Sequence, residues 1–407
     1  MTDPRIAVLA TLDTKLEEAR YVAEQIRRHG GVPIVVNIGT DDVEDELVSV
    51  TQQEVRAHAE PDDTSEPKAR LMRSAAIGAR ALLRAKITAG QIDAVIAIGG
   101  GQGSWISSTA LRDLPVGFPR LLVSTAGRDV GQYTKFADLT NVFSITDVAG
   151  LNPLLTRVLS TAAAGIVGMA RSTAWREALP DGLTAMTVYG ITTPGARLIM
   201  KELDAAGIQT VAFHSNGVGG PTMEQQIASG TFRAVLDWSI TEVADDVVGG
   251  VCAVGPGRLT NAPRLGLPQV IVPGGVDVVN FGAPDTIPAH LRGRLTHAHT
   301  PEATLLRTNA EENVEIATLV ADRIRHTRAP IRIIVPLGGF SSLSEAGQAL
   351  SDPEADRAFL TTLKTQLNDH PLITVSSVDA PINSPEFAAH VAGSFLALVH
   401  STTNGDN

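Results

Sequence analysis

The segment Asp93-Ala-Val-Ile-Ala-Ile-Gly-Gly-Gly-Gln-Gly-Ser104 is the most informative part of this chain. Its apolar residues, Ala94 to Ile98, predict a buried strand, and glycines follow at positions 99, 100, 101 and 103. Glycine lets backbone N–H groups come close to an anion, and the start of the next helix adds partial positive charge. The segment therefore indicates either a phosphate-binding loop or a tight turn with no ligand.

This glycine loop differs from two familiar phosphate-binding motifs. A Walker A loop ends in Gly-Lys-Ser/Thr, whereas here Gly103 is followed by Ser104 and Trp105. The dinucleotide-binding fingerprint has its glycines at another spacing and another place in the fold. The sequence thus suggests a phosphate-bearing ligand without naming one.

The composition is that of a globular protein with more than one domain. The chain has 407 residues, of which 43% are hydrophobic and 19% charged, and two domains are the usual arrangement at this length. The net charge of −11 and the aromatic content of only 4% argue against a nucleic-acid-binding surface. We therefore expect a small-molecule partner and no nucleic acid.

Cysteine usage and hydropathy indicate the compartment. The single cysteine, Cys252, excludes an internal disulfide and suits a reducing environment. The N-terminal residues carry no secretory pattern, and no apolar run reaches the roughly 20 residues that span a bilayer. We expect a cytoplasmic protein without membrane contact.

Strand-like and helix-like segments alternate along the chain. In the first half, the apolar segments Ile6–Ala10 and Pro33–Ile38 flank a helical pattern at Lys15–His29. This β-α-β order predicts a parallel sheet with ligands at the C-terminal ends of its strands. A second series begins at Leu183. We predict an α/β fold of two parallel-sheet domains, residues 1–178 and 183–407, that face each other across a cleft.

Two segments are predicted to be connections between these elements. Residues 41–63 are acidic and contain proline, and we expect them to form an exposed excursion. Trp175 to Gly182 is expected to link the two domains.

Polar loops follow the predicted strands of the first domain. Thr11 and Asp13 come directly after the first strand and face the glycine loop in a parallel sheet, although Asp13 or Thr14 can instead cap a helix. Thr125 follows another strand and can hold a phosphate or ribose, or form a turn. Asp147 can bind ribose hydroxyls or a metal ion, or cap the next helix.

The second domain offers candidate catalytic residues. His214 ends a strand beside a glycine-rich segment and can act as a general acid or base, or only satisfy loop carbonyls. Glu242, Asp245 and Asp246 lie at helical spacing, which suits either a metal site or a solvated helix start. Asp277 follows a further strand and can reach a ligand.

Several stretches together resemble a family of uncharacterised two-domain proteins from bacteria and plants that are related to the tomato mosaic virus resistance protein. The resemblance extends over roughly residues 5–400 and is specific as a set. The stretches that carry it are ATLDTK, AIGGGQGS, LPVGFPRLLVSTA, SITDVAGLN, GITTPG, AFHSNGVGGPTME, LDWSITEVADDVVGG and VDVVNFG.

This resemblance implies two Rossmann-like domains, binding of ATP with Mg by the N-terminal domain, and self-association into a homo-oligomer. Carried over by motif, the residues implied at the nucleotide site are Gly99, Gly100, Gly101, Gly103 and Ser104, flanked by Thr125, Asp147, Thr11 and Asp13.

Three hypotheses about function follow, and the third is a scaffold in which a bound nucleotide only stabilises a dimer. The first is a nucleotide-binding protein that holds Mg-ATP at the glycine loop. The alternative is an enzyme of small-molecule metabolism that acts on a phosphorylated or carboxylated substrate in the cleft. In that alternative, His214 is the acid or base, and Glu242 or Asp277 is its partner.

Overall fold

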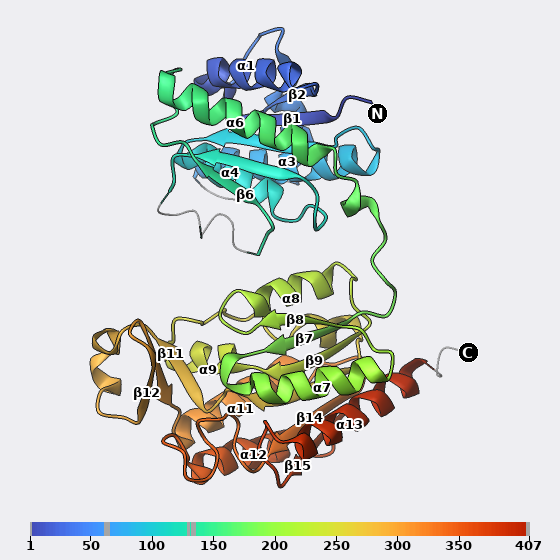
Figure 1. The fold of residues 1–407 in the computed structure, drawn as a ribbon, viewed down its shortest axis with the longest axis vertical. Helices are drawn as coiled ribbons and strands as arrows, with labels where there is room; N and C mark the ends of the chain where they lie inside the picture. Colours follow the sequence, from blue (N-terminus) through green and yellow to red (C-terminus); the bar gives the residue numbers. More distant parts are fainter. Residues whose placement is uncertain (1, 61–65, 128–130, 132–135, 404–407) are drawn as a thin grey trace. The chain divides into compact units, whose positions relative to one another are not determined.

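The computed structural model describes residues 2–60, 66–127, 131 and 136–403. It divides into two compact units, residues 1–178 and 179–407, and each is described here by itself. Each unit contains a six-stranded sheet in which neighbouring strands run parallel, covered by helices on both faces (Figure 1). The predicted α/β class is therefore confirmed, while the expected cleft stays a prediction.

The N-terminal unit has the strand order β3-β2-β1-β4-β5-β6. This order is that of the Rossmann fold, in which the sheet grows outward from a central first strand in both directions. Its strands are β1 (Arg5–Ala10), β2 (Val32–Asn37), β3 (Val48–Val50), β4 (Ala94–Gly99), β5 (Arg120–Ser124) and β6 (Thr140–Phe143).

Strand residues that alternate in direction fill two separate cores in this unit. Ile6 and Val8 pack with one pair of helices, whereas Ala7 and Leu9 pack with the helices on the opposite face. Both faces are covered, which is why β1 and β4 are apolar throughout. The first face carries α1 (Leu12–Arg28) and α6 (Pro153–Ala170), and the second carries α2 (Gln52–Ala57), α3 (Pro67–Thr88) and α4 (Gly101–Leu111).

Residues 41–60 differ from the expected excursion, whose last three residues, 61–63, lie outside the described part of the chain. They contain β3, which pairs with β2, and the short helix α2. Thr51 begins α2 with a capping box, because its hydroxyl accepts from the Glu54 amide while the Glu54 carboxylate accepts from the Thr51 amide. The buried side chain of Val55 then fixes α2 to the core.

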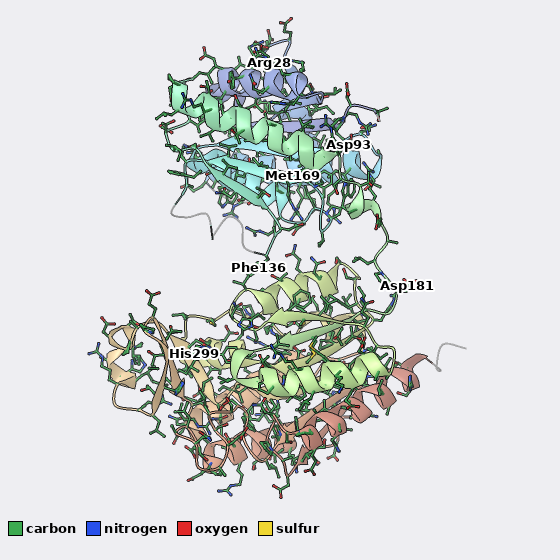
Figure 2. All side chains as sticks on the ribbon, in the orientation of Figure 1. Arg28, Asp93, Phe136, Met169, Asp181 and His299 are labelled. Carbon is green, nitrogen blue, oxygen red and sulfur yellow. The ribbon has the colours of Figure 1, made fainter. Side chains whose placement is uncertain are left out.

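The predicted linker also begins later than expected. The Trp175 ring packs edge-on against Phe118, with centroids 4.9 Å apart, and Arg176 pairs with Asp93. Asp93, labelled in Figure 2, also binds Arg5, so these contacts close the N-terminal unit at its last short helix, η1 (Ala174–Arg176).

The C-terminal unit has the strand order β15-β14-β10-β9-β7-β8. One face carries α9 (Thr241–Val248), α11 (Ala310–Ile324) and α12 (Pro353–Leu367), and the other carries α7 (Thr193–Ala205) and α13 (Pro385–Thr403). The strands are β7 (Thr184–Val188), β8 (Thr210–His214), β9 (Ala234–Ser239), β10 (Gln269–Gly274), β14 (Ile331–Pro336) and β15 (Ile373–Val378). Two further helices, α8 (Gly219–Ala228) and α10 (Asn261–Leu265), pack at the β8 edge.

A small antiparallel sheet extends the C-terminal unit. Its order is β11-β13-β12, with β11 (Val278–Phe281), β12 (Thr296–Thr300) and β13 (Ala303–Arg307). Its strand β12 is largely polar and exposed.

One helix in the described part of the chain, α6, is long and apolar enough to cross a membrane by length and composition alone. Its 18 residues have a mean hydropathy of 1.4. In the structure Leu155, Leu159, Ile166 and Val167 on this helix pack into the core beside α1.

Candidate functional site

The glycine loop lies at the topological switch point of the N-terminal sheet. Strand order reverses between β1 and its neighbour β4, and a parallel sheet binds ligands where the loops of two such strands diverge. Thr11 follows β1, and Gly100 follows β4. The two loops that the sequence indicated are therefore neighbours in space.

A cavity of about 160 Å³, here called the cradle cavity, lies between these loops. Gly39 and Thr40, which follow β2, also reach it. Trp105 is not among the described lining residues and packs instead against the core beneath α3 and α4. The lining residues are Thr11, Asp13, Thr14, Lys15, Gly39, Thr40, Met72, Gly100, Gly101, Gln102, Gly103 and Ile106.

Packing within the protein requires glycine at one of the four glycine positions of this loop but not at the other three. A Cβ at Gly99 would lie 2.5 Å from the Ser104 nitrogen, so packing of the loop on itself requires glycine there. A Cβ at Gly100 would come no closer than 3.9 Å to any atom, one at Gly101 would meet nothing within 4 Å, and one at Gly103 would make only ordinary contacts at 3.7 Å. None of these three has positive φ. The protein's own packing therefore does not explain three of the four glycines.

The start of α4 presents its backbone amides at this cavity. Gly100 is the N-terminal cap and has no side chain that could accept from the helix amides. The Ser104 amide is the first to bond back, to the Gly100 carbonyl at 2.8 Å. The amides of Gly101, Gln102 and Gly103 precede it and have no acceptor within the helix. Those three residues line the cradle cavity, which is the arrangement that binds anions.

Ser104, which the resemblance placed at the nucleotide, is fully buried. Its hydroxyl lies 2.6 Å from the Ser124 hydroxyl and bonds to the Gly99 carbonyl. Ser104 therefore fixes the loop to β5 and is not a lining residue of the cavity.

The loop after β1 brings one carboxylate and one ammonium group to the cavity. Asp13 does not cap α1, because its Oδ2 accepts from the amide and hydroxyl of Thr40. Thr11 occupies the cap position, but its hydroxyl bonds to the Thr14 hydroxyl at 3.2 Å and not to an amide of the helix. Lys15 has non-helical backbone angles, and its ammonium group bonds the Thr14 carbonyl at 3.3 Å. Asp13 and Lys15 are the charged residues of the described cavity lining.

Thr125 and Asp147 are placed differently with respect to the loop. The Thr125 amide bonds to the Gly99 carbonyl, and its hydroxyl lies 3.9 Å from where a Gly100 Cβ would be. Asp147 is exposed and does not line the cradle cavity. It does not cap α6 either, because the Asn152 side chain accepts from the amides of Leu154 and Leu155.

A second, strongly acidic cavity adjoins the first. It measures about 520 Å³ and shares Asp13 and Thr14 with the cradle cavity. Glu17, Glu18, Asp41 and Asp42 are its other acidic lining residues. Among the described residues, no three His, Cys, Asp or Glu side chains form a group that could hold a metal ion.

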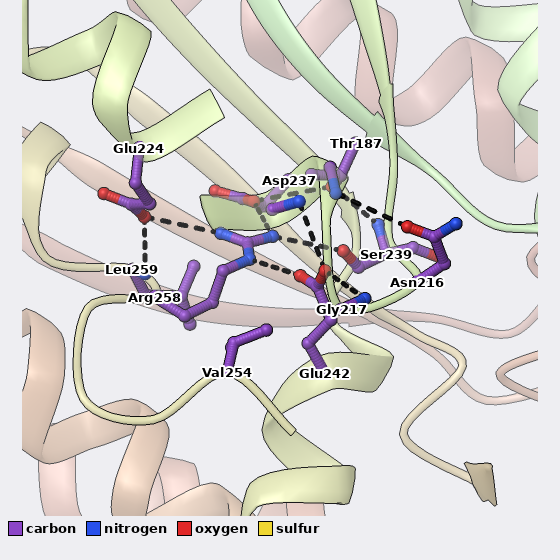
Figure 3. A network of polar contacts seen from close by, with 12 residues as sticks. Thr187, Asn216, Gly217, Glu224, Asp237, Ser239, Glu242, Val254, Arg258 and Leu259 are labelled. Carbon is purple, nitrogen blue, oxygen red and sulfur yellow. Dashed lines mark hydrogen bonds and ion pairs between the residues drawn. The ribbon is translucent and has the colours of Figure 1, made fainter. Parts of the chain in front are cut away.

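The glycine-rich loop of the C-terminal unit is filled by a side chain of the protein itself. Glu242, which begins α9, is fully buried, and its Oε1 accepts from the amides of Gly217 and Gly220 at 2.9 and 3.2 Å. Its Oε2 accepts from Arg258 Nε at 3.0 Å (Figure 3). The carboxylate thus occupies the start of α8, where an external anion would otherwise bind.

Arg258 is the centre of a buried charge network. Besides Glu242, its guanidinium pairs with Asp237 and lies 3.5 Å from Glu224 Oε1, and all four side chains are at most 7% exposed (Figure 3). Burial lowers the pKa of Arg258, but the three carboxylates outweigh it and raise that pKa. Burial also raises the pKa of Glu224. Both sequence interpretations of Glu242 as metal ligand or solvated helix start are therefore wrong.

The three candidate catalytic residues belong to separate surroundings. His214 is exposed, and its ring lies 6.0 Å from the Tyr189 ring, centroid to centroid. Asp277 is fully buried and accepts from the Ser341 hydroxyl at 2.5 Å. Glu242 is engaged with Arg258. Within the described part of the chain, no hydrogen bond or ion pair joins any two of these three side chains, so the enzyme hypothesis gains no support from their geometry.

Sequence reasoning missed a buried polar chain beside this network. The Tyr189 hydroxyl donates to Asn280 Oδ1 at 2.6 Å, and Asn280 Nδ2 donates to Asp245 Oδ2 at 2.8 Å. Burial raises the pKa of Asp245 to about 7 and that of Cys252 to about 12, so this thiol stays protonated. Tyr189, Asn280 and Asp245 come together because β11 packs against α9, and the sequence carries no local signal for that packing.

The two parallel sheets define a two-domain α/β protein with a Rossmann-like strand order in its N-terminal unit. The chain belongs to the uncharacterised protein family UPF0261: residues 4–174 match the model of its N-terminal domain, and residues 182–399 match that of its C-terminal domain. The resemblance inferred from the motifs is therefore confirmed.

Curated relatives extend over almost the whole chain. A UPF0261 protein of Clostridium tetani is 33% identical over 97% of this chain and 99% of its own length. One of Rhizobium meliloti is 35% identical over 97% and 99%. The ToMV resistance protein Tm-1(GCR237) of Solanum lycopersicum is 31% identical over 97% of this chain but only 56% of its own length.

Among solved structures, the glycosyltransferase SnogD of Streptomyces nogalater is similar over 98% of this chain and 100% of its own. Its sequence is 12% identical and the TM-score is 0.19, a value too low to support any statement about this protein.

Proposed function

We propose that this protein binds a nucleotide, ATP with Mg, through the glycine loop of its N-terminal unit. The observation that carries the proposal is the set of Gly100, Gly101 and Gly103. Their missing side chains leave α4 amides open to the cradle cavity, and no contact within the protein requires glycine there. Triphosphate oxygens are the anions such amides favour.

The charged groups around the cavity support a metal-bound nucleotide. Lys15 supplies one positive charge for phosphate oxygens. Mg is commonly held by phosphate oxygens, waters and one or two carboxylates, and Asp13 is the carboxylate in this lining. Asp13 would hold the ion, which would neutralise phosphate charge. The acidic residues next to it make a metal-free triphosphate less favourable here.

Calorimetric titration of the full chain with ATP, with and without Mg, tests this proposal. Gly100→Val and Gly103→Val should weaken ATP binding at least tenfold, because a branched side chain would cover the amides. Gly165→Val is the matched control, since Gly165 is also open, exposed and in the same unit. Absence of ATP binding to the unmodified protein at millimolar concentration would refute the proposal. We also expect self-association in the cytoplasm, for which light scattering is the measure.

A further inference from the structure

Two large apolar side chains are exposed beside the glycine loop. Phe143 ends β6 with 47% of its surface accessible, and Ile145 follows with 60%. Other phenylalanines, such as Phe118, Phe340 and Phe359, are at most 1% exposed. Exposed apolar groups that lie next to polar loops mark binding sites more often than isolated ones do.

Ile145 is held in a backbone conformation that a β-branched residue rarely adopts. Its φ is +66°, and the Thr146 amide bonds to the Ser144 carbonyl at 2.7 Å across it, which makes a γ-turn. Ser144 in turn bonds to the Ser124 carbonyl of β5 at 3.0 Å. Strain of this kind persists where surrounding contacts impose it, and it gathers at ligand sites.

The strand register fixes where Phe143 lies. Gly99 pairs with Ser124, and Ser124 pairs with Phe143, so the three form one row across β4, β5 and β6. Two strand spacings place Phe143 about 10 Å from Gly99. Because Ser124 points to Ser104 in α4, Phe143, in register with it, points to the same face of the sheet.

Contacts of described residues connect the loop to this ring. Thr125 lies beside Gly100, and Gly127, two residues on, packs so closely that a Cβ there would lie 3.0 Å from Phe143 Cδ2. The Gly127 amide bonds to the Thr125 carbonyl at 2.9 Å. Thr125 and Gly127 thus connect Gly100, which lines the cradle cavity, to the Phe143 ring.

We propose that Phe143 and Ile145 form the base subsite of the nucleotide site, with a purine base stacked on the Phe143 ring and Ile145 against its edge. The inference rests on the proposed function and specifies its ligand. The span of about 10 Å suits a nucleotide whose phosphates contact the α4 amides and whose ribose passes Thr125. An aromatic face gains stacking energy from any base, and adenine is a good stacking partner.

The opposite side of the cradle is less suited to a base. That side holds the acidic cavity of about 520 Å³, which is lined by Asp41, Asp42 and Glu17. None of the described lining residues of this cavity is aromatic. Carboxylates can accept ribose hydroxyl bonds but offer no stacking surface for a ring.

Comparison of ATP with inorganic tripolyphosphate, both with Mg, isolates the base subsite. For the unmodified protein we expect tighter binding of ATP. Phe143→Ala should weaken ATP binding about tenfold, equivalent to about 1.4 kcal/mol, and leave tripolyphosphate binding unchanged. Phe143→Trp should retain ATP affinity. Val116→Ala, which removes another exposed apolar side chain (58% accessible), should change neither.

The outcomes separate this inference from the proposed function. The base subsite is refuted if the unmodified protein binds ATP and tripolyphosphate with equal affinity. It is also refuted if Phe143→Ala weakens the binding of both ligands equally. Either result leaves the proposed phosphate binding at the cradle cavity unaffected. Binding of neither ligand refutes both. A tenfold selective loss of ATP binding, reversed by Phe143→Trp, supports the inference.

Discussion

Two of the glycine-rich loops of this chain have similar sequences and opposite structural states. Gly99–Gly103 and Gly217–Gly220 each follow a parallel strand and lead into a helix. In the first, the helix amides face a cavity. In the second, the Glu242 carboxylate accepts from them. A glycine-rich loop before a helix therefore predicts a position where the backbone amides favour an anion. The tertiary structure decides whether that anion is a ligand or a side chain of the protein.

The reason for each glycine differs accordingly. A Cβ at Gly219 would lie 2.0 Å from the His214 carbonyl oxygen, and one at Gly220 would lie 1.9 Å from Glu242 Oε2. Internal packing thus requires both residues of the second loop. A Cβ at Gly100 or Gly101 would meet no such obstacle, and the proposed function therefore assigns these two glycines to ligand access.

The largest effect should come from Arg258→Ala. This change leaves the buried carboxylates of Asp237, Glu242 and Glu224 without their cation, and we expect the C-terminal unit to lose about 5 kcal/mol of unfolding free energy. Urea denaturation followed by circular dichroism measures it. Arg264→Ala is the control, because Arg264 is exposed and its guanidinium bonds to Asn261, outside the buried network. A loss no larger than in the control would contradict the network.

Glu242→Ala should leave the amides of the second glycine loop without an internal acceptor. The amides of Gly217 and Gly220 and the Arg258 guanidinium lose their acceptor, at a cost of about 3 kcal/mol. Added formate should restore part of the thermal stability, because it binds the vacated position only in the folded state. Melting temperatures in formate and chloride at equal ionic strength are compared with those of Glu202→Ala, a change at an exposed carboxylate. The same response in both variants would disprove an internal anion site.

Two alanine substitutions separate structural from accessible glycine within the first loop. Gly99→Ala places a Cβ 2.5 Å from the Ser104 nitrogen and should cost about 2 kcal/mol. Gly100→Ala, at a φ of −78°, should change stability by less than about 0.5 kcal/mol. Thermal unfolding of the two variants in parallel gives both numbers, and equal losses would show that the loop packs differently.

The buried acids should make the C-terminal unit the more pH-sensitive of the two. The pKa of Asp245 is about 7 in the folded unit against 3.8 ordinarily, so the folded state binds the proton more tightly. Protonation of Asp245 therefore stabilises the folded unit. This contribution to the free energy of unfolding is complete below pH 3.8 and is lost as the pH rises to about 7, with a slope of at most about 1.4 kcal/mol per pH unit.

Asp245→Asn should flatten that slope, measured as urea unfolding free energy from pH 4 to pH 7. Part of the slope should remain, since burial raises the pKa of Asp356 to about 6. An unaltered slope in Asp245→Asn would mean that this carboxyl is ionised in the folded protein at low pH.

The sequence located the loops well but not all of their roles. Thr11, Asp13 and the glycines were brought together as expected, because parallel strands that begin at one edge of a sheet must also end at one edge. Ser104 was taken for a ligand contact and is buried, since its hydroxyl turns toward Ser124 of a strand whose register the sequence does not state. Asp147 was a helix-cap candidate, but Asn152 holds that position beside Pro153.

Local pattern by itself determined the alternating strands and helices, the parallel sheets and the position of the glycine run, because hydrophobic periodicity and backbone freedom act over a few residues. Whether the amides of a glycine loop bind a side chain was decided only by the tertiary structure, because that side chain comes from a distant part of the sequence. Arg258 lies in a glycine-rich loop with no regular pattern, yet it neutralises Glu242 and so closes one loop. In the other loop, Gly101, Gln102 and Gly103 line the cradle cavity, and its occupation by a ligand stays a prediction.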